Sequence, residues 1–336
     1  MKKTSNRRRT KRSLLLLLML LFTGTMLGTS TYAWFTSNKT VSVTDITVNV
    51  AAKNGIQISV DGTNWKSILS TTDLLAASQT YPGAINQIPN ESNSIQPVST
   101  IGTVLSGGLM QMFVGDVPSN DAGEYILTST QSTEVNGTQG DFIAFDIFLK
   151  SDKAVDLDMT GSSGVTAEGN DTGIKNASRV AFLVQGSTSS DASVSDIQSL
   201  ALTAGSTEGI YIWEPNYNVH TGTGIANARD TYGLTITANE TDPLAYDGIK
   251  AEILESENIL LGAANKTNYP QKFDAVNISY KTRDTFAGES VIPIFSLPAG
   301  ITKVRVYMWI EGQDVDCENN ASGGNINYNL QFTIHE

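Results

Sequence analysis

The sequence predicts an all-β protein: an antiparallel two-sheet sandwich of jelly-roll type with long loop insertions, preceded by an N-terminal signal or transmembrane helix. Apolar and polar residues alternate along about ten segments, and helical spacing is rare between them. Strands with one apolar and one polar face are typical of antiparallel sheets, which bury one face and leave the other in water. A basic and then apolar segment precedes the first alternating run.

The first 33 residues have the three parts of a secretory signal peptide. Seven basic residues precede an apolar run at residues 14–22, and a junction of small residues ends at Ala33. We therefore expect signal peptidase to cleave between Ala33 and Trp34, which leaves the mature protein extracellular or at the cell surface. The alternative is an uncleaved anchor, because residues 13–33 have the length of about 20 residues that spans a bilayer.

The strands are expected at regular intervals along the rest of the chain. Residues 55–68 are interpreted as a hairpin with Asp61-Gly62 at its turn, since Gly accepts the positive φ that such turns need. The other expected strands are residues 41–50, 142–150, 178–184, 209–213, 232–238, 289–297, 303–310 and 325–334. Short helices are expected at residues 194–202 and 246–262.

Three of these strands show clearly which face belongs to the core. Their apolar residues recur at every second position, which places them on one side of a strand. The predicted core residues are Ile143, Phe145, Ile147 and Leu149; Val304, Val306, Met308 and Ile310; and Ile326, Tyr328, Leu330, Phe332 and Ile334.

We interpret residues 34–336 as a single β-sandwich domain. Two long polar stretches, near residues 70–136 and 186–285, separate groups of strands and are interpreted as insertions that decorate the sandwich. Two sandwiches in tandem is the alternative.

The charge distribution argues against a nucleic-acid partner. The formal net charge is −12, but the first 33 residues contain seven basic residues and no acidic one. Residues 34–336 therefore carry 15 basic and 34 acidic residues, a net charge of −19, which repels phosphate backbones. Membrane contact is expected only through the N-terminal segment before cleavage.

The junction also carries a family resemblance. The residues Tyr32-Ala33-Trp34-Phe35, followed by the alternating run 41–50, resemble the SipW-dependent secreted proteins of Gram-positive bacteria, the TasA and camelysin-like biofilm matrix family. Residues 142–159 resemble the paired strands of that family, and residues 309–314, followed by a closing strand, resemble a recurrent ending of related secreted proteins. The resemblance implies a non-enzymatic structural protein of the cell surface or extracellular matrix.

A self-assembly mechanism is consistent with this pattern. Cleavage would free an apolar, strand-forming N-terminus that can add to a sheet edge of another copy, and a repeated head-to-tail contact produces a filament. Deleting residues 34–50 should then abolish fibres and leave the monomer folded. The alternative is that residues 41–50 form an ordinary first strand of their own sheet.

Two acidic groups are candidate Ca²⁺ ligands. Glu311, Asp314, Asp316 and Glu318 follow a predicted strand closely, and Ca²⁺ binds six to eight oxygens. Asp152, Asp156 and Asp158 form a similar group. The alternative in both cases is an acidic segment exposed to solvent, and no cofactor is required by the sequence.

A third candidate site lies near Trp213, Glu214 and Tyr217, with His220 close behind. Aromatic faces pack on sugar rings and carboxylates accept their hydroxyls, so these residues could bind a glycan. The alternative is a strand that ends at Pro215 with its aromatic residues in the core.

The sequence contains no recognisable catalytic motif, and we expect no catalytic residue. The chain has no H-E-x-x-H pair and no G-x-S-x-G motif, and its one cysteine, Cys317, is expected to be an inert thiol. Three functions compete: a matrix protein, an adhesin or glycan-binding module, and a secreted hydrolase with carboxylates on its strands.

Overall fold

The computed structural model describes residues 40–50, 55–89, 94–232, 247–261, 271–284, 286 and 291–335. Contacts divide the chain into two units, residues 1–31 and 32–336, and every described residue belongs to the second. The predicted signal peptide, with Ala33 and Trp34, lies outside the described residues. Within the described ranges, no helix has the length and apolar character needed to cross a membrane.

The described chain is mostly β, as the sequence predicts. Its strands are β1 (Ser42–Val50), β2 (Gln57–Ser59), β3 (Ile68–Ser70), β4 (Pro97–Ser99), β5 (Met112–Asp116), β6 (Thr128–Ser132), β7 (Ile143–Ser151), β8 (Val155–Thr160), β9 (Gly164–Glu168), β10 (Ser178–Thr188), β11 (Ile210–Glu214), β12 (Asp247–Ile249), β13 (Phe273–Ala275), β14 (Tyr280–Lys281), β15 (Val291–Leu297), β16 (Gly300–Glu311) and β17 (Asn325–Ile334). The α-helices are α2 (Thr71–Ala76), α3 (Val194–Ser199) and α4 (Gly222–Tyr232). The short 3₁₀ turns are η2 (Ala77–Gln79), η3 (Ser106–Gly108), η4 (Ile174–Ala177), η5 (Glu255–Glu257) and η7 (Asn319–Ala321).

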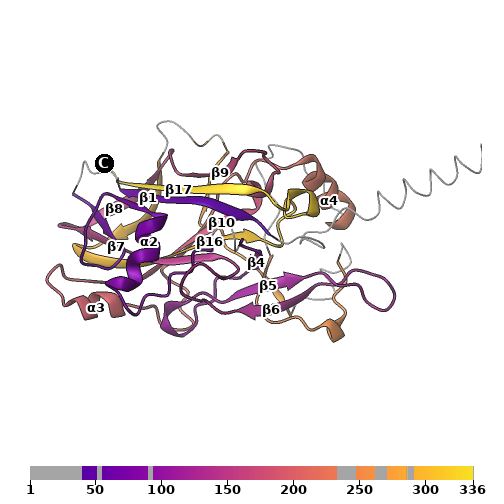
Figure 1. Cartoon of the computed structure of the whole chain (residues 1–336), viewed down its shortest axis with the longest axis horizontal. Helices are drawn as coiled ribbons and strands as arrows, with labels where there is room; N and C mark the ends of the chain where they lie inside the picture. The colour runs from indigo at the N-terminus through magenta and orange to yellow at the C-terminus, as the bar shows by residue number, and fades with distance from the viewer. Residues whose placement is uncertain are drawn as a thin grey trace, which may run out of the picture. The chain divides into compact units, whose positions relative to one another are not determined.

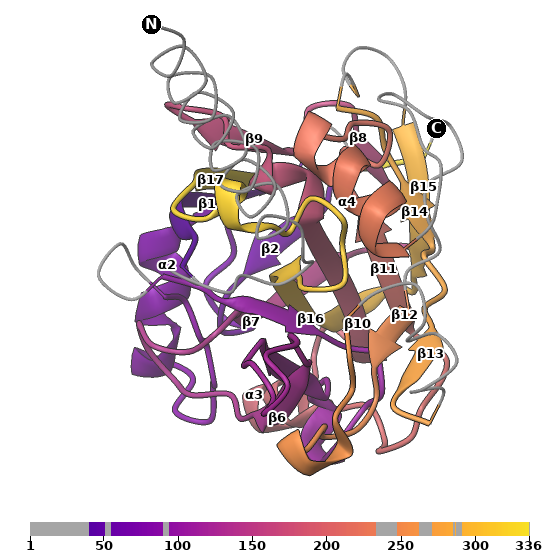
Figure 2. The same cartoon turned by 90° about the vertical axis from the view of Figure 1, so that its right-hand side faces the viewer.

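Two large sheets contain most of these strands. The six-stranded sheet has the order β15-β8-β17-β1-β3, with β9 also paired to β17. The nine-stranded sheet has the order β14-β11-β10-β16-β4-β5-β6, with β7 paired to β16 and β2 paired to β7. In Figure 1, β1 and β17 form a layer above β7 and β16. Figure 2 shows β11, β10 and β16 side by side in the second sheet.

The expectation of purely antiparallel sheets is wrong, because both sheets are mixed. The parallel pairs are β1 with β17, β4 with β16, and β11 with β14. A short turn forces two strands to run antiparallel, but each of these pairs joins segments that are far apart in the chain. No local turn therefore sets their direction, and alternation along one strand cannot reveal it.

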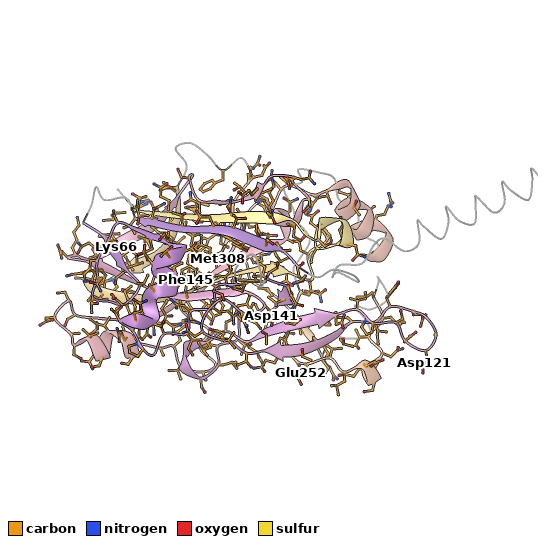
Figure 3. All side chains as sticks on the ribbon, viewed as in Figure 1. Lys66, Asp121, Asp141, Phe145, Glu252 and Met308 are labelled. Carbon is orange, nitrogen blue, oxygen red and sulfur yellow. The ribbon has the colours of Figure 1, made fainter. Side chains whose placement is uncertain are left out.

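The largest apolar cluster draws on both sheets. It contains every core residue predicted on β7, β16 and β17, all less than a tenth exposed, which confirms those three faces. From β1 it receives Val43, Ile46, Val48 and Val50. Phe145 and Met308 lie between the two layers in Figure 3. This shared core fixes the position of each central strand.

The predicted turn at Asp61-Gly62 is present, but the predicted hairpin is reduced to a single bridge, because β2 pairs with β7 and β3 pairs with β1 in the other sheet. Ile58 and Lys66 exchange backbone hydrogen bonds of 2.9 and 2.8 Å, and Gly62 between them has a φ of +75°. The buried Asp61 carboxylate accepts the backbone N–H groups of Thr63 and Asn64, each at 2.8 Å. The loop is therefore closed by the Asp61 side chain as well as by the single bridge between Ile58 and Lys66.

The two stretches interpreted as insertions pack against each other. Phe113 and Leu127, from residues 70–136, share an apolar cluster with Ile249, Ile253 and Phe273, from residues 186–285. The first stretch also supplies β4, β5 and β6 to the edge of the nine-stranded sheet. The interpretation of one domain with two insertions stays a prediction.

The helix predictions have mixed outcomes. The helix expected at residues 194–202 is confirmed as α3. The helix expected at residues 246–262 is wrong, because the described part of that range holds β12 and the single turn η5. The strand expected at residues 232–238 falls almost wholly outside the described residues, and Tyr232 itself ends α4.

Candidate functional site

Two of the sequence-predicted sites meet at one buried arginine, Arg179 on β10. Its Nη2 lies 2.8 Å from Glu214 Oε1 and 2.7 Å from Asp314 Oδ2. The Arg179 side chain is 2% exposed, and both carboxylate side chains are 7% exposed. β10 lies between β11 and β16, so residues at the ends of both neighbouring strands reach the guanidinium.

A second ion pair lies in the same region of the molecule. His220 Nδ1 is 2.8 Å from Asp316 Oδ2, and the histidine side chain is 8% exposed. Asp316 Oδ1 accepts hydrogen bonds from the backbone N–H and the hydroxyl of Thr221, at 2.8 and 3.0 Å. We call Arg179, Glu214, Asp314, His220 and Asp316 the buried charge cluster.

The Asp316 carboxylate also lies at the first turn of α4. The Thr221 hydroxyl accepts the backbone N–H of Gly224 at 2.8 Å, as the residue before a helix commonly does. A carboxylate next to a helix N-terminus is favoured by the positive end of the helix dipole. Asp316 therefore joins α4 to the β16–β17 loop through charge and hydrogen bonds together.

Burial and neighbouring charges shift the pKa values in the buried charge cluster. Burial raises the pKa of the Glu214 carboxyl, and the nearby Arg179 only partly offsets that effect. Burial opposes the charged form of His220, but the hydrogen bond and charge of Asp316, with Asp314 and Glu214 nearby, raise the pKa of this imidazole overall. The acidic neighbours of His220 therefore favour its protonated form.

Of the four predicted Ca²⁺ ligands, Glu311, Asp316 and Glu318 are buried and Asp314 is half-buried with a side chain only 7% exposed, so the alternative of a solvated loop is wrong for this segment. Glu311 accepts the Trp309 indole N–H at 3.0 Å, Asp314 binds Arg179, and Asp316 binds His220. The three carboxylates therefore engage separate partners. Among the described residues, no group of three or more His, Cys, Asp or Glu side chains could hold a metal ion.

The other acidic group is also divided by the fold. Asp156 is exposed and accepts the Ser296 hydroxyl at 2.5 Å. Asp158 is 1% exposed, and its Oδ2 lies 2.9 Å from His335 Nδ1. Asp152 is exposed. Asp156 and Asp158 thus differ in burial although their spacing suggests a common exposed face.

The predicted glycan residues are also dispersed. Trp213 is fully buried in the largest apolar cluster, and its indole N–H donates to the Thr282 hydroxyl at 2.9 Å. The Glu214 carboxylate forms an ion pair with Arg179, and Tyr217 is half-buried. The Trp213 ring has no face open to solvent here, and glycan binding by this stretch stays a prediction.

A second group of buried charges escaped the sequence reasoning. Arg305 Nη1 lies 2.8 Å from Asp146 Oδ1, and Arg305 also pairs with Glu134. Lys303 Nζ lies 3.3 Å from Asp146 Oδ2 and donates to the Tyr81 hydroxyl at 3.0 Å. The sequence places Arg305 opposite a core face and so suggests solvent, but the 70–136 stretch covers it.

Two members of the buried charge cluster belong to a loop that lies next to β1. Asp314 and Asp316 belong to the β16–β17 loop, whose far end bonds the start of β1. Gly323 N–H donates to the Thr40 carbonyl at 2.9 Å, and Ser42 N–H donates to the Gly324 carbonyl at 3.1 Å. Within each of the two charge clusters, the described cations are paired with carboxylates of the same cluster.

No protein-family model, curated protein or solved structure matches this chain.

Proposed function

We propose that the protein is a secreted, non-enzymatic structural protein of the cell surface or extracellular matrix that self-assembles by exchanging β1 between copies. The observation that carries this proposal is the pairing of β1. It runs parallel to β17 from Ser42 opposite Asn325 to Val50 opposite Phe332. The first described strand thus lies beside the last one, in the interior of the six-stranded sheet.

A parallel pair of this kind is suited to exchange between copies. The partners β1 and β17 are linked by no short turn, so the pairing does not depend on both strands belonging to one chain. A second copy offers an identical β1, with the same apolar side chains and backbone groups. Exchange therefore preserves the contacts, and a head-to-tail series of exchanges does not close on itself.

The sequence supports the cellular setting of this proposal. The signal peptide pattern implies export with signal peptidase as a partner, and the resemblance to the TasA and camelysin-like family implies a matrix role. We further infer a sandwich of jelly-roll type, which the apolar cluster shared by the two sheets supports. Copies of the same chain are the expected partners, and nucleic acid is not.

The experiment locks β1 into its own chain. Thr47 and Asn329 are opposite residues on β1 and β17, and both are half-buried. The variant Thr47→Cys/Asn329→Cys, in a Cys317→Ala background, should form an intramolecular disulfide. Electron microscopy of residues 34–336 should show fibres from the reduced variant and none from the oxidised one.

A matched disulfide on the other side of β17 is the control. Thr166 on β9 lies opposite Asn327 on β17, so Thr166→Cys/Asn327→Cys locks β17 without restraining β1. This variant should form fibres in both redox states. Fibres from the oxidised β1–β17 variant, or none from the unmodified chain, would refute strand exchange.

A further inference from the structure

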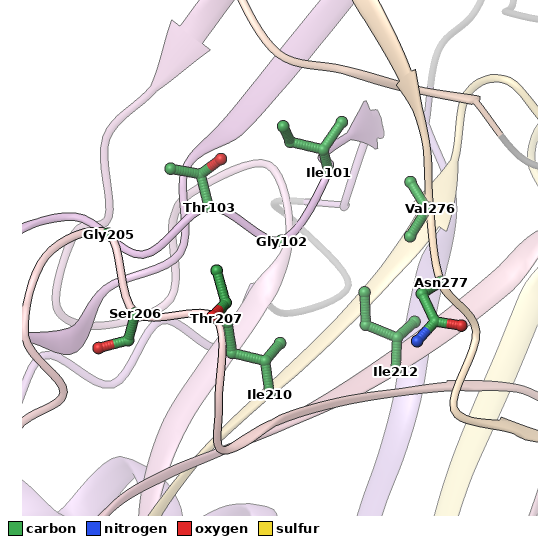
Figure 4. A pocket seen from close by; sticks show the side chains of 10 residues that line it. All are labelled: Ile101, Gly102, Thr103, Gly205, Ser206, Thr207, Ile210, Ile212, Val276 and Asn277. Atoms are coloured by element: carbon green, nitrogen blue, oxygen red, sulfur yellow. The ribbon is translucent and has the colours of Figure 1, made fainter.

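A cavity of about 290 Å³ opens on the side of β11 that faces away from the largest core. Ile210 and Ile212 point to this side, whereas Tyr211 and Trp213 point into that core. Figure 4 shows the loop 205–207 and the segment 276–277 on either side of these isoleucines. Segments far apart in the sequence thus build one concave site.

The lining of the cavity is uncharged. None of the ten described residues that line it is acidic, basic or histidine. Ionic ligands such as phosphates and carboxylates would lose hydration there without gaining a charged partner. The site therefore suits a neutral ligand and offers no acid or base for catalysis.

The floor of the cavity is formed by branched aliphatic side chains. They are Ile101, Ile210, Ile212 and Val276. Ile212 is 3% exposed and belongs to the second apolar cluster, against which Ile210 and Val276 pack. The floor is thus supported from behind and presents methyl groups to a ligand.

The rim carries neutral hydrogen-bonding groups. The hydroxyls of Thr103 and Thr207 and the amide of Asn277 make no hydrogen bond to another described residue. The Ser206 hydroxyl donates to the Thr203 carbonyl at 2.6 Å, so its oxygen can still accept one. These groups surround the aliphatic floor and can serve a ligand that has polar edges.

We propose that this cavity binds one N-acetylated, uncharged sugar residue. About 290 Å³ lies at the lower end of ligand-pocket volumes and suits a single sugar ring. An acetyl methyl packs on the aliphatic floor, the acetamido group bonds the Asn277 amide, and ring hydroxyls bond Thr103 and Thr207. The inference is independent of strand exchange, and it would give a structural protein a point of attachment to polysaccharide.

The experiment titrates the mature chain with N-acetylglucosamine and follows backbone and methyl resonances by NMR. Saturable shifts should be confined to the residues that line the cavity. Glucose should bind at least about 10-fold more weakly, because it lacks the acetamido group. A trimer of N-acetylglucosamine distinguishes a polysaccharide ligand from a free sugar. If the trimer binds more tightly than the monomer, the site binds a polymer chain. If both bind equally, the site binds the free sugar or the end of a chain.

Two variants and one control test the residues. Thr207→Val and Asn277→Ala, both at exposed positions, should each weaken binding at least about 5-fold without affecting the fold. Thr133→Val removes a hydroxyl from an exposed threonine that does not line the cavity and should leave binding unchanged. The proposal is overturned by an absence of saturable shifts, by shifts centred elsewhere, by equal affinity for glucose, or by unchanged affinity in both cavity variants.

Discussion

At the scale of single residues, the most unusual feature is the burial of charge on central strands. Arg179 and Arg305 are each 2% exposed, and each is matched by two carboxylates. A buried ion pair adds little net stability when it is complete, because desolvation offsets the attraction. Removing one partner is costly, because the other charge then remains buried and uncompensated.

The substitution Arg179→Met tests this argument. It leaves Glu214 and Asp314 buried without their cation, so the free energy of unfolding should fall by about 3–5 kcal/mol in urea denaturation. Lys66→Met is the control, since it breaks the Lys66–Asp73 pair, whose lysine side chain is 49% exposed. Its cost should stay below about 1 kcal/mol. Equal costs for both variants would contradict the role of Arg179.

A pH dependence follows from the raised pKa of His220. A histidine with a raised folded pKa stabilises the fold below its ordinary value of about 6.5, and that stabilisation is lost as pH rises through the folded pKa. The raised pKa values of Glu214 and Asp316, due to burial, act in the same direction. The free energy of unfolding should therefore decrease between pH 6 and pH 8.

The measurement is urea denaturation at pH 6, 7 and 8. His220→Gln should flatten the decrease, because the titrating partner of Asp316 is gone. His335→Gln replaces the other histidine of the chain, which contacts Asp158 and not Asp316. This variant should retain the decrease in the free energy of unfolding. A wild-type stability that does not change over this range would be inconsistent with the buried His220–Asp316 pair.

At acidic pH the free energy of unfolding should change in the opposite direction and fall as the pH falls. Asp61 and Asp146 are buried, which by itself raises a carboxyl pKa, but hydrogen bonds at Asp61 and the cations Arg305 and Lys303 at Asp146 lower both values overall. Their stabilisation is present above the ordinary aspartate pKa of about 4 and is lost as pH falls through the lowered folded values. Stability should therefore be greatest on the mildly acidic side of neutrality.

Only part of the charge cluster was predictable from the sequence. Glu214, His220, Asp314 and Asp316 stand out as two local groups, but their meeting depends on the neighbouring positions of β10, β11 and β16. Arg179 begins an apolar strand and carries no local sign that two carboxylates will cover it. Pairing between distant segments supplies that information, and a local pattern does not contain it.

At the scale of elements, α4 depends on its contact with Asp316. Gly224 lies in the first turn of this helix, and a Cβ built there would be 2.3 Å from Asp316 Oδ1. That carboxylate is buried and held by His220 and Thr221, so it cannot move aside easily. Gly224 is needed because the backbone of α4 lies very close to the Asp316 carboxylate, and not because glycine is flexible.

The substitution Gly224→Ala should therefore destabilise the protein by about 1–3 kcal/mol, the usual cost of overpacking. Alanine in a helix is normally favoured over glycine by about 1 kcal/mol, so the expected sign is reversed. Gly222→Ala is the matched control, because a Cβ at Gly222 meets no atom within 4 Å. Thermal unfolding of both variants checks the difference, and a stabilised Gly224→Ala variant would contradict it.

The elements divide into those with a local signal and those without one. Strict alternation identified the core faces of β7, β16 and β17, because it reports directly which side of a strand is apolar. A helix was expected at residues 246–262, but Ile249 and Ile253 of this range enter a separate apolar cluster, and Ile249 does so from strand β12. The helix α4 was missed because its segment contains few apolar residues and two glycines.

At the scale of the whole molecule, the arrangement of β1 is the central feature. The first described strand contributes to the largest core and pairs in parallel with the last strand, so the two ends of the described chain complete one sheet. The sequence predicted a strand at residues 41–50 but could not identify its partner. In the proposed assembly, an exchanged β1 would make the same contacts with β17 as it makes in the closed monomer.

The most direct test mixes two single-cysteine chains in the Cys317→Ala background. One chain carries Thr47→Cys and the other Asn329→Cys, which are opposite residues on β1 and β17. A mixture of Thr166→Cys and Asn327→Cys chains, opposite residues on β9 and β17, is the control for random collision.

Strand exchange predicts a disulfide between the two chains after mild oxidation, seen as a species of doubled mass on a non-reducing gel, with little of it in the control mixture. If the Thr47→Cys and Asn329→Cys chains stay unlinked while the double variant links within one chain, β1 remains in its own sheet and the proposed assembly is contradicted.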